Sequence, residues 1–359
     1  MKTTRLQPIN PHRDSCLSLS GRTNIVSLLN TSDRLWSIVL AGGEGSRVSS
    51  LIHRWLGRPT PKQYCAFVGT RSMFQHTLDR AAKLTPPERI VTVAAHRHCR
   101  EALAQLDGKG NSTILFQPAN RDTAAGVFLP LTYIRARAPN ATVVLYPSDH
   151  FVYPEARFLD TVRHAVRIAE SQPDRLVMLG VAPDRLELDY GWILPGPSLA
   201  GLPDEPVQAV RWFLEKPGAA QADAALRAGA LWNMLVFAAN VDLLWTLGWQ
   251  CLPDMMPLFE RLSQAIGGPE EGRALEAIYR DMPAKNFSSD LLQQVPERLA
   301  VIELTGVLWS DWGKPERITE TLRRIDRQPS FPLSCLDRPF APFPFTAADG
   351  GLSMNTSSL

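Results

Sequence analysis

A glycine-rich turn, residues 42–47 (Gly-Gly-Glu-Gly-Ser-Arg), follows a short apolar run at residues 36–41. Glycines let backbone N–H groups approach a phosphate closely and form an anion-binding concavity. The guanidinium of Arg47 can hold phosphate oxygens in bidentate fashion. Further along the chain, Lys62 supplies a second cation. This pattern indicates a site for a phosphorylated ligand, with Arg47 and Lys62 as its charged contacts.

The turn fits neither of two well-known phosphate-binding loops. A Walker loop requires Gly-Lys-Ser/Thr after a second glycine, and this stretch has no such sequence. A dinucleotide fingerprint requires G-x-G-x-x-G, but Val48 stands where the last glycine is needed. A nicotinamide-dependent dehydrogenase, one alternative for such a turn, is therefore disfavoured.

Two carboxylates follow apolar stretches, at places where strands would end. Asp149 comes just after the run at residues 142–146, and Asp311 follows the stretch from 301 to 309. Mg²⁺ prefers oxygen ligands and takes one or two protein carboxylates together with substrate phosphates. We therefore expect Asp149 and Asp311 to bind a magnesium ion that neutralises charge on the phosphates of a substrate.

The elements that would position these residues alternate along the first half of the chain. Strands are predicted at residues 36–41, 89–94, 113–116, 142–146 and 175–180, and the clearest amphipathic helix at 155–170. Continuous apolar strands separated by such helices are typical of an α/β fold with a mainly parallel sheet covered on both faces. In that kind of sheet, ligands bind at the carboxyl ends of the strands.

The second half of the chain has longer and more aromatic strand patterns, at residues 191–194, 207–214 and 231–238, followed by helical patterns from 240 to 281. We expect it to add mixed sheet and a substrate-side region to one domain spanning residues 34–327. Residues 1–33 are expected to form a disordered extension, and the proline-rich residues 328–359 a tail of low order.

Composition narrows the class of protein. The chain has 359 residues, of which 45% are hydrophobic and 21% charged, and a net charge of +2, so bulk charge gives no reason for nucleic-acid binding. It lacks the run of roughly 18 apolar residues that marks a membrane span. The 5 cysteines are scattered without a C-x-x-C pair, which favours a reducing compartment and hence the cytoplasm.

Further motifs follow the glycine-rich turn in a fixed order, beginning with Pro61-Lys62-Gln63. They lie at residues 117–124, 147–150, 190–193, 213–217, 231–233, 286–288 and 309–313. This ordered series, over about residues 35–325, resembles the sugar-1-phosphate nucleotidyltransferases, and most closely their mannose-1-phosphate guanylyltransferase branch.

The resemblance implies a Rossmann-like fold of the nucleotide-diphospho-sugar transferase type, with Mg²⁺ as cofactor. It implies transfer of GMP from GTP to mannose 1-phosphate, with release of pyrophosphate and formation of GDP-mannose. Arg47 and Lys62 are then catalytic, and Asp149 and Asp311 bind the metal. The residues implied to bind the nucleotide are Gly42, Gly43, Gly45, Gln117, Thr123 and Ala124. Those implied to bind the sugar phosphate are Gly191, Glu215, Lys216 and Asn233.

The chain departs from the family pattern in three places. Residues 48–51 replace a Leu-x-Pro-Leu, which predicts a longer and more mobile loop before Lys62. Asp122 stands where Asn or Gly is usual, which predicts a negative charge near the nucleobase. Leu235 replaces a glycine after Asn233, which predicts an altered floor of the sugar pocket.

Several alternatives stay open from the sequence. The same chemistry could use another nucleotide or another hexose 1-phosphate, and the chain could be a non-catalytic regulator that binds nucleotide sugars. A degenerate relative of that kind is expected to lack one of the four charged residues, and all four are present. A homo-oligomer is also left open.

Overall fold

The computed structural model describes residues 34–106, 112–199 and 206–336. The predicted disordered extension (1–33) and residues 337–359 of the predicted tail lie outside the described residues. Everything below concerns the described ranges.

The main sheet has nine strands in the order β3-β2-β1-β4-β9-β6-β10-β8-β7. They are β1 (Leu35–Ala41), β2 (Ile90–Ala95), β3 (Thr113–Gln117), β4 (Thr142–Pro147), β6 (Leu176–Val181), β7 (Gly191–Ser198), β8 (Val207–Glu215), β9 (Leu231–Asn240) and β10 (Leu299–Glu303). Strands β3, β2, β1 and β4 are parallel to one another, and β6 is parallel to β10. Strands β8 and β9 run against their neighbours. A separate pair joins β5 (Phe151–Tyr153) to β11 (Leu308–Ser310).

Strand β1 shows why the sheet is buried on both sides. Leu35, Val39 and Ala41 enter one hydrophobic core, whereas Trp36 and Ile38 enter another. Successive side chains of a strand point to opposite faces of the sheet. A strand covered twice therefore has an unbroken apolar sequence, which is what the run at 36–41 shows.

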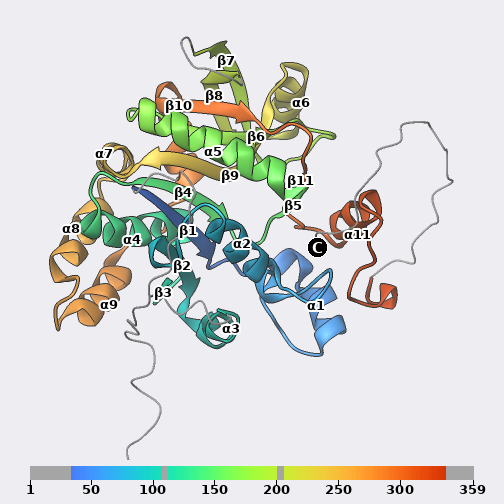
Figure 1. The fold of residues 1–359 in the computed structure, drawn as a ribbon, viewed down its shortest axis with the longest axis horizontal. Helices are drawn as coiled ribbons and strands as arrows, with labels where there is room; N and C mark the ends of the chain where they lie inside the picture. Colours follow the sequence, from blue (N-terminus) through green and yellow to red (C-terminus); the bar gives the residue numbers. More distant parts are fainter. Residues whose placement is uncertain (1–33, 107–111, 200–205, 337–359) are drawn as a thin grey trace, which may run out of the picture.

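Helices cover both faces of the sheet. One core receives side chains from α2 (Met73–Ala82), α3 (Cys99–Ala104), α5 (Glu155–Ser171) and α6 (Ala219–Arg227). The other receives them from α4 (Asp122–Arg137), α7 (Val241–Cys251), α8 (Met256–Ala265), α9 (Glu271–Asp281) and α10 (Phe287–Asp290). Figure 1 shows α5 lying across one face of the sheet. The prediction of an α/β fold is confirmed, and the predicted helix at 155–170 corresponds to α5. The sheet is mixed rather than mainly parallel, because four of its strand pairings are parallel and five are antiparallel.

A third, smaller core lies apart from the two cores that cover the faces of the sheet. It joins Leu51 and Ile52 of α1 (Ser49–Leu56) to Ile318 and Leu322 of α11 (Pro315–Arg324). The expectation of a mobile loop before Lys62 is therefore wrong. With no proline in residues 48–56, the segment forms α1 and buries its apolar side chains.

Residues 328–336, which belong to the predicted low-order tail, pack against this third core. Phe331 is buried there, and Arg54 donates a hydrogen bond of 2.7 Å to the carbonyl of Cys335. Short 3-10 helices complete the description: η1 (Ser46–Val48), η2 (Lys62–Tyr64), η3 (Pro87–Arg89), η4 (His96–His98), η5 (Leu292–Gln294), η6 (Pro296–Arg298) and η7 (Leu333–Cys335). None of the helices in the described ranges is long and apolar enough to cross a membrane.

Candidate active site

The glycine-rich loop leads from β1 into η1 and is fixed by a side chain from η2. Gln63 donates from Nε2 to the carbonyls of Ala41 and Gly43, both at 2.9 Å. Gly45 has φ +62°, and a Cβ there would lie 2.5 Å from Cβ of Lys62. Only glycine fits this close approach, so the loop and η2 are held together. Sequence reasoning missed Gln63, although it directly follows Lys62 in the matched motif.

Lys62 lies at the centre of a charged cluster that collects the predicted catalytic and metal-binding residues. Its ammonium is 2.8 Å from Oδ2 of Asp149, and its side chain is only 4% exposed. The same ammonium donates a hydrogen bond to the backbone carbonyl of Asp311. Residues far apart in the sequence, at the ends of β4 and β11, therefore meet at one amine.

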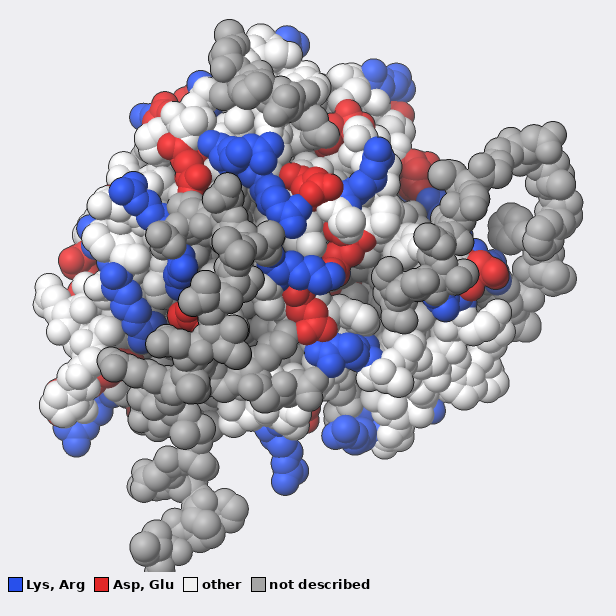
Figure 2. Space-filling view, viewed as in Figure 1, with Lys and Arg blue, Asp and Glu red and all other residues white. Residues whose placement is uncertain are grey.

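Arg47 completes this cluster from the glycine-rich loop. Its Nη2 is 3.0 Å from Oδ2 of Asp311, and its Nη1 is 3.0 Å from Oδ2 of Asp189. A Cβ at Gly313 would lie 2.4 Å from Oδ2 of Asp311 and 2.6 Å from Nη2 of Arg47. This contact therefore requires glycine at position 313. On the face of the molecule shown in Figure 2, Lys and Arg side chains are interspersed with Asp and Glu. The ion pairs of the cluster therefore form between neighbouring side chains.

The second carboxylate oxygen of Asp311 has three donors. Oδ1 accepts hydrogen bonds from Tyr190 (2.5 Å), Arg317 (2.8 Å) and the backbone N–H of Gly313 (3.0 Å). Burial alone would raise the pKa of Asp311, but Lys62, the Tyr190 hydroxyl and Arg317 outweigh it and lower that pKa. The carboxylate therefore stays ionised. Sequence reasoning gave Tyr190 no role of its own within its motif and did not single out Asp189 or Arg317. The weak signal for Arg317 is a charge beside the apolar face of α11.

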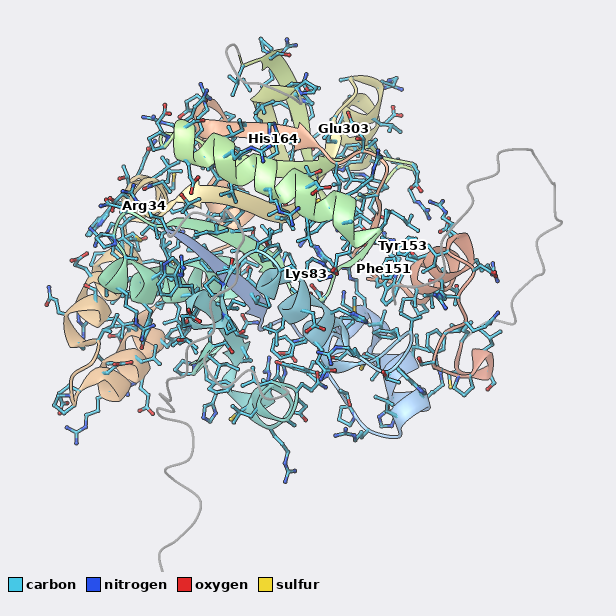
Figure 3. All side chains as sticks on the ribbon, in the orientation of Figure 1. Arg34, Lys83, Phe151, Tyr153, His164 and Glu303 are labelled. Atoms are coloured by element: carbon cyan, nitrogen blue, oxygen red, sulfur yellow. The ribbon has the colours of Figure 1, made fainter. Side chains whose placement is uncertain are left out.

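Trp312 anchors this segment to the rest of the domain. Its ring stacks on Phe151 of β5, with centroids 4.7 Å apart, and Figure 3 shows Phe151 on the side of the domain that faces α11. The backbone at Trp312 has φ +46°, a conformation that favours glycine. Stacking and the third core thus hold a turn that presents Asp311 to the cluster.

The two predicted metal ligands differ in how well they fit a metal ion. Asp149 is 34% exposed and gives Oδ2 to Lys62, while Oδ1 has His150 Nε2 at 3.8 Å. Burial would raise the pKa of Asp149, but Lys62 and His150 lower it, so its charged form is available to a cation. Both oxygens of Asp311 already have donors, and a metal ion at Oδ2 would take the place of Arg47.

The described residues hold no cluster of three or more His, Cys, Asp or Glu side chains. Of the two predicted ligands, Asp149 is the better placed, because both carboxylate oxygens of Asp311 already accept hydrogen bonds.

The predicted sugar-phosphate residues form a second group next to the charged cluster. Gly191 pairs with Glu215 between β7 and β8. A Cβ at Gly191 would lie 2.7 Å from Oε2 of Glu215 and 3.2 Å from Cβ of Asn233. Lys216 is 3.8 Å from Oε1 of Glu215, and its backbone N–H donates to the carbonyl of Tyr190. Because Tyr190 also contacts Asp311, the two groups adjoin.

Glu215 is a largely buried carboxyl group. Its side chain is 15% exposed. Burial raises its pKa, against the opposing effect of Lys216, and the charge of Asp122 raises it further. The carboxyl group is thus a costly one to keep ionised at this position.

Leu235 lies at the position where the family pattern has glycine. It has φ +51°, in the left-handed region that favours glycine. Its backbone N–H donates to Oδ1 of Asn233 at 2.9 Å. The backbone shape that a glycine would adopt easily is thus present here with a leucine side chain.

The predicted nucleotide residues at the end of β3 and the start of α4 are mostly engaged with the protein. Gln117 donates to the Tyr279 hydroxyl at 3.0 Å, and a Cβ at Gly42 would lie 3.0 Å from its Oε1. Thr123 Oγ1 accepts from the backbone of Phe287 at 2.8 Å. The backbone N–H of Ala124 donates to the backbone carbonyl of Lys285, two residues before Phe287. Thr123 and Ala124 therefore tie α4 to residues 285–287.

An open cavity of about 700 Å³ lies beside the glycine-rich loop. Its walls come from the loop, α1, the Pro59–Pro61 stretch and η4, and they include Ser46, Ser49, Thr60 and His98. Arg47, Lys62, Asp149 and Asp311 do not line it. The side chains of the charged cluster are therefore packed against one another, and the cavity lies beside the cluster.

The family description Nucleotidyl transferase matches residues 36–328 of this chain. The chain belongs to the nucleotidyl transferase family. A mannose-1-phosphate guanylyltransferase of Escherichia coli is 26% identical to this nucleotidyl transferase over 288 residues, covering 79% of this chain and 60% of that protein. Mannose-1-phosphate guanylyltransferase RfbM of Salmonella typhimurium is 32% identical over 211 residues, covering 56% of this chain and 42% of RfbM. The chain thus spans 60% or less of the length of these curated relatives.

A solved structure supports the same family assignment. The crystal structure of a mannose-1-phosphate geranyltransferase from Thermus thermophilus superposes with a TM-score of 0.68 at 26% identity. The match covers 80% of this chain and 79% of the other.

Proposed function

We propose that the protein transfers GMP from GTP to mannose 1-phosphate, releasing pyrophosphate and forming GDP-mannose. The observation that carries this proposal is the meeting of Arg47, Lys62 and Asp149 in one cluster beside the group formed by Gly191 and Glu215. The names of the E. coli and Salmonella relatives, both mannose-1-phosphate guanylyltransferases, support the choice of guanine and mannose.

In this reaction an oxygen of the sugar phosphate attacks the α-phosphorus of the nucleotide, and the bond to the β-phosphate oxygen breaks. Two polyanions must be held together in line, so positioning and charge neutralisation dominate. Arg47 and Lys62 supply the two cations, and the N–H groups of the loop orient phosphate oxygens. A Mg²⁺ ion held by Asp149, with Asp311 as a second ligand, would supply further neutralisation of the phosphates.

The second group of residues would hold the sugar. Glu215 and Asn233 offer oxygen acceptors and an amide donor to sugar hydroxyls, and Lys216 offers a charge to the sugar phosphate. Gly191 lets the Glu215 and Asn233 side chains approach the backbone next to Tyr190. Gly42, Gly43 and Gln117 would contact the nucleotide. Thr123 and Ala124 would support that part of the site through their hydrogen bonds to residues 285–287.

A cytoplasmic location belongs to the same proposal. No disulfide links the cysteines of the described ranges, which supports a reducing compartment.

The test is a pyrophosphate-release screen with four nucleoside triphosphates and several hexose 1-phosphates, each with Mg²⁺ and with EDTA. We expect release that is fastest with GTP and mannose 1-phosphate and absent in EDTA. Faster release with another pair would correct the substrates and keep the chemistry. Nucleotide-sugar binding without release from any pair would favour the non-catalytic regulator, and release that persists in EDTA would remove the metal roles.

A further inference from the structure

Arg317 of α11 is a buried cation held between two buried carboxylates. Its Nη1 is 2.8 Å from Oδ1 of Asp311 and 2.6 Å from the Tyr190 hydroxyl, while its Nη2 pairs with Glu187. The side chains of Arg317, Asp311 and Glu187 are 9%, 8% and 8% exposed. The guanidinium also lies over the Tyr190 ring, 4.8 Å from its centroid.

Glu187 is itself fixed, so Arg317 has little freedom to move. Oε1 of Glu187 accepts hydrogen bonds from the backbone N–H groups of Leu188 and Asp189, both at 3.1 Å. Its carbonyl accepts from Nε1 of Trp192 at 2.9 Å. The buried face of α11 carries Ile318 beside Arg317, so the helix cannot turn without exposing apolar surface.

Arg47 differs from Arg317 in the same ion-pair network. Arg47 is 47% exposed and bridges two carboxylates, Asp311 and Asp189. Each of those carboxylates has a second cation: Arg317 on Asp311, and Lys314 at 3.3 Å on Asp189. Arg47 can therefore leave without stranding either charge.

We propose that Arg317 is a positioning residue for nucleotide binding, which neutralises Asp311 so that Arg47 can exchange its carboxylate partners for a substrate phosphate. An unpaired buried carboxylate is strongly unfavourable. Without Arg317, Asp311 would therefore hold Arg47 more tightly, and a phosphate would compete less well for it. This inference rests on the proposed function, because it takes Arg47 as a phosphate ligand.

The experiment measures GTP affinity by calorimetry, with no sugar phosphate present, in EDTA and again in Mg²⁺. We expect Arg317→Met to weaken GTP binding tenfold or more and Arg317→Lys to weaken it less. The matched control is Arg324→Met on the same helix. Arg324 is 47% exposed and pairs with Asp184 and Glu320, so its loss should change GTP affinity less than twofold.

A charge-neutralising double variant separates positioning from packing. In the Arg317→Met background, Asp311→Asn removes the stranded charge, and we expect GTP affinity measured in EDTA, where no metal ligand is lost, to recover at least threefold. Glu187→Gln breaks the other half of the Arg317 clamp but leaves its pair with Asp311. We expect it to lower the melting temperature with GTP affinity unchanged.

Three outcomes would overturn the inference: unchanged GTP binding by Arg317→Met, an equal loss in Glu187→Gln, or no recovery in the double variant. If Arg317→Met does not fold, Arg317→Lys and its own double variant decide by the same criteria. Arg47→Met separates this inference from the proposed function. If Arg47→Met binds GTP normally, the phosphate role of Arg47 is wrong. If it binds weakly while Arg317→Met binds normally, only the present inference fails.

Discussion

The charged cluster adjoins the group of proposed sugar-phosphate residues at Tyr190, yet the two are held in different ways. That second group, called the sugar group below, comprises Gly191, Glu215, Lys216 and Asn233, with Leu235 close by. The cluster depends on ion pairs between Arg47, Lys62 and carboxylates from distant parts of the chain. The sugar group depends on strand pairing and on backbone at positive φ, as at Lys216 and Leu235. Ion pairs can change partners when a charged ligand arrives, whereas paired strands cannot. In the proposed reaction the phosphates would therefore meet side chains whose ion pairs must be released, whereas the sugar would meet a preformed surface.

The largest effect should come from removing the central amine of the cluster. Lys62→Met is expected to lower kcat by about 10²–10³-fold, since removing one preorganised group at a developing charge costs that much in well-studied sites. Steady-state pyrophosphate release measures it. The control is Lys83→Met, which removes an exposed lysine next to α2 that pairs with Glu155 (Figure 3) and should leave kcat unchanged. A loss of kcat of less than tenfold in Lys62→Met would show that Lys62 is not a catalytic residue.

Asp149 tests the metal side of the same cluster. Asp149→Asn should abolish turnover, because the amide removes the charge offered to a cation while keeping the shape of the side chain. Circular dichroism should show an intact fold. Retained activity with an unchanged Mg²⁺ requirement would exclude Asp149 as the metal ligand.

Two glycine substitutions compare the regions directly. At Gly313 a Cβ would meet Asp311 and Arg47, and at Gly191 it would meet Glu215 and Phe213, all within 2.9 Å. Gly313→Ala should raise the KM for GTP roughly tenfold, and Gly191→Ala should raise the KM for mannose 1-phosphate by a similar factor, given about 1.4 kcal/mol per tenfold. Each should leave the other KM within twofold.

The matched control for both is Gly272→Ala in α9, where a Cβ would meet nothing within 4 Å. It should change neither KM and should stabilise the helix by about 0.5–1 kcal/mol. If either site glycine variant raised both KM values equally, the two regions would not be separable.

Glu215→Gln tests how unfavourable it is to keep the Glu215 carboxyl group ionised in the folded protein. The pKa of Glu215 is raised in the folded state, so the folded protein binds the carboxyl proton more tightly than the unfolded chain does. The stability from that proton is complete below the unfolded pKa of about 4.3 and is lost as pH rises through the folded pKa. Glutamine should therefore raise the melting temperature at pH 7.5 but not at pH 4.

The same variant should raise the KM for mannose 1-phosphate about tenfold, since a hydrogen bond to a charged group contributes about 1.5–3 kcal/mol. Equal shifts in melting temperature at both pH values would contradict the assignment of the raised pKa.

The smallest effect concerns backbone strain in the sugar group. Leu235→Gly and Leu235→Ala both remove the side chain, but alanine keeps a Cβ at φ +51°. Glycine should therefore be more stable than alanine by about 1 kcal/mol, the reverse of the usual order in a strand. Urea unfolding of the two variants measures the difference. An alanine variant as stable as the glycine variant would mean that the strand relaxes.

The sequence predicted much of the fold because the strands of this sheet are buried on both faces. Runs such as 36–41 and 142–146 are apolar throughout, and they match β1 and β4. It also predicted four charged residues that the structure brings into one cluster, since each lies in a short ordered motif. It did not predict α1, because the comparison with a proline-containing pattern suggested a loop.

The partners of those charged residues could not be predicted. Glu187 and Asp189 contact Arg317 and Arg47 across long sequence separations. Arg317 is close to Asp311 in the sequence, but no local pattern marks which arginine of an amphipathic helix is buried. The positive φ at Leu235 was equally hidden, because leucine disfavours it and only the surrounding β9 pairing imposes it.

The third core has a consequence for the order in which the protein is made. Lys62 and Asp149 leave the ribosome early, but Asp311, Arg317 and Phe331 come near the end of the described chain. Strands β1 to β9 are synthesised before any of them, and domains fold as synthesis proceeds at about 5–20 residues per second. A nascent chain can therefore assemble much of the sheet while Lys62 still lacks one of its two acceptors. Within the described ranges, the charged cluster is therefore completed only after most of the strands of the sheet have been synthesised.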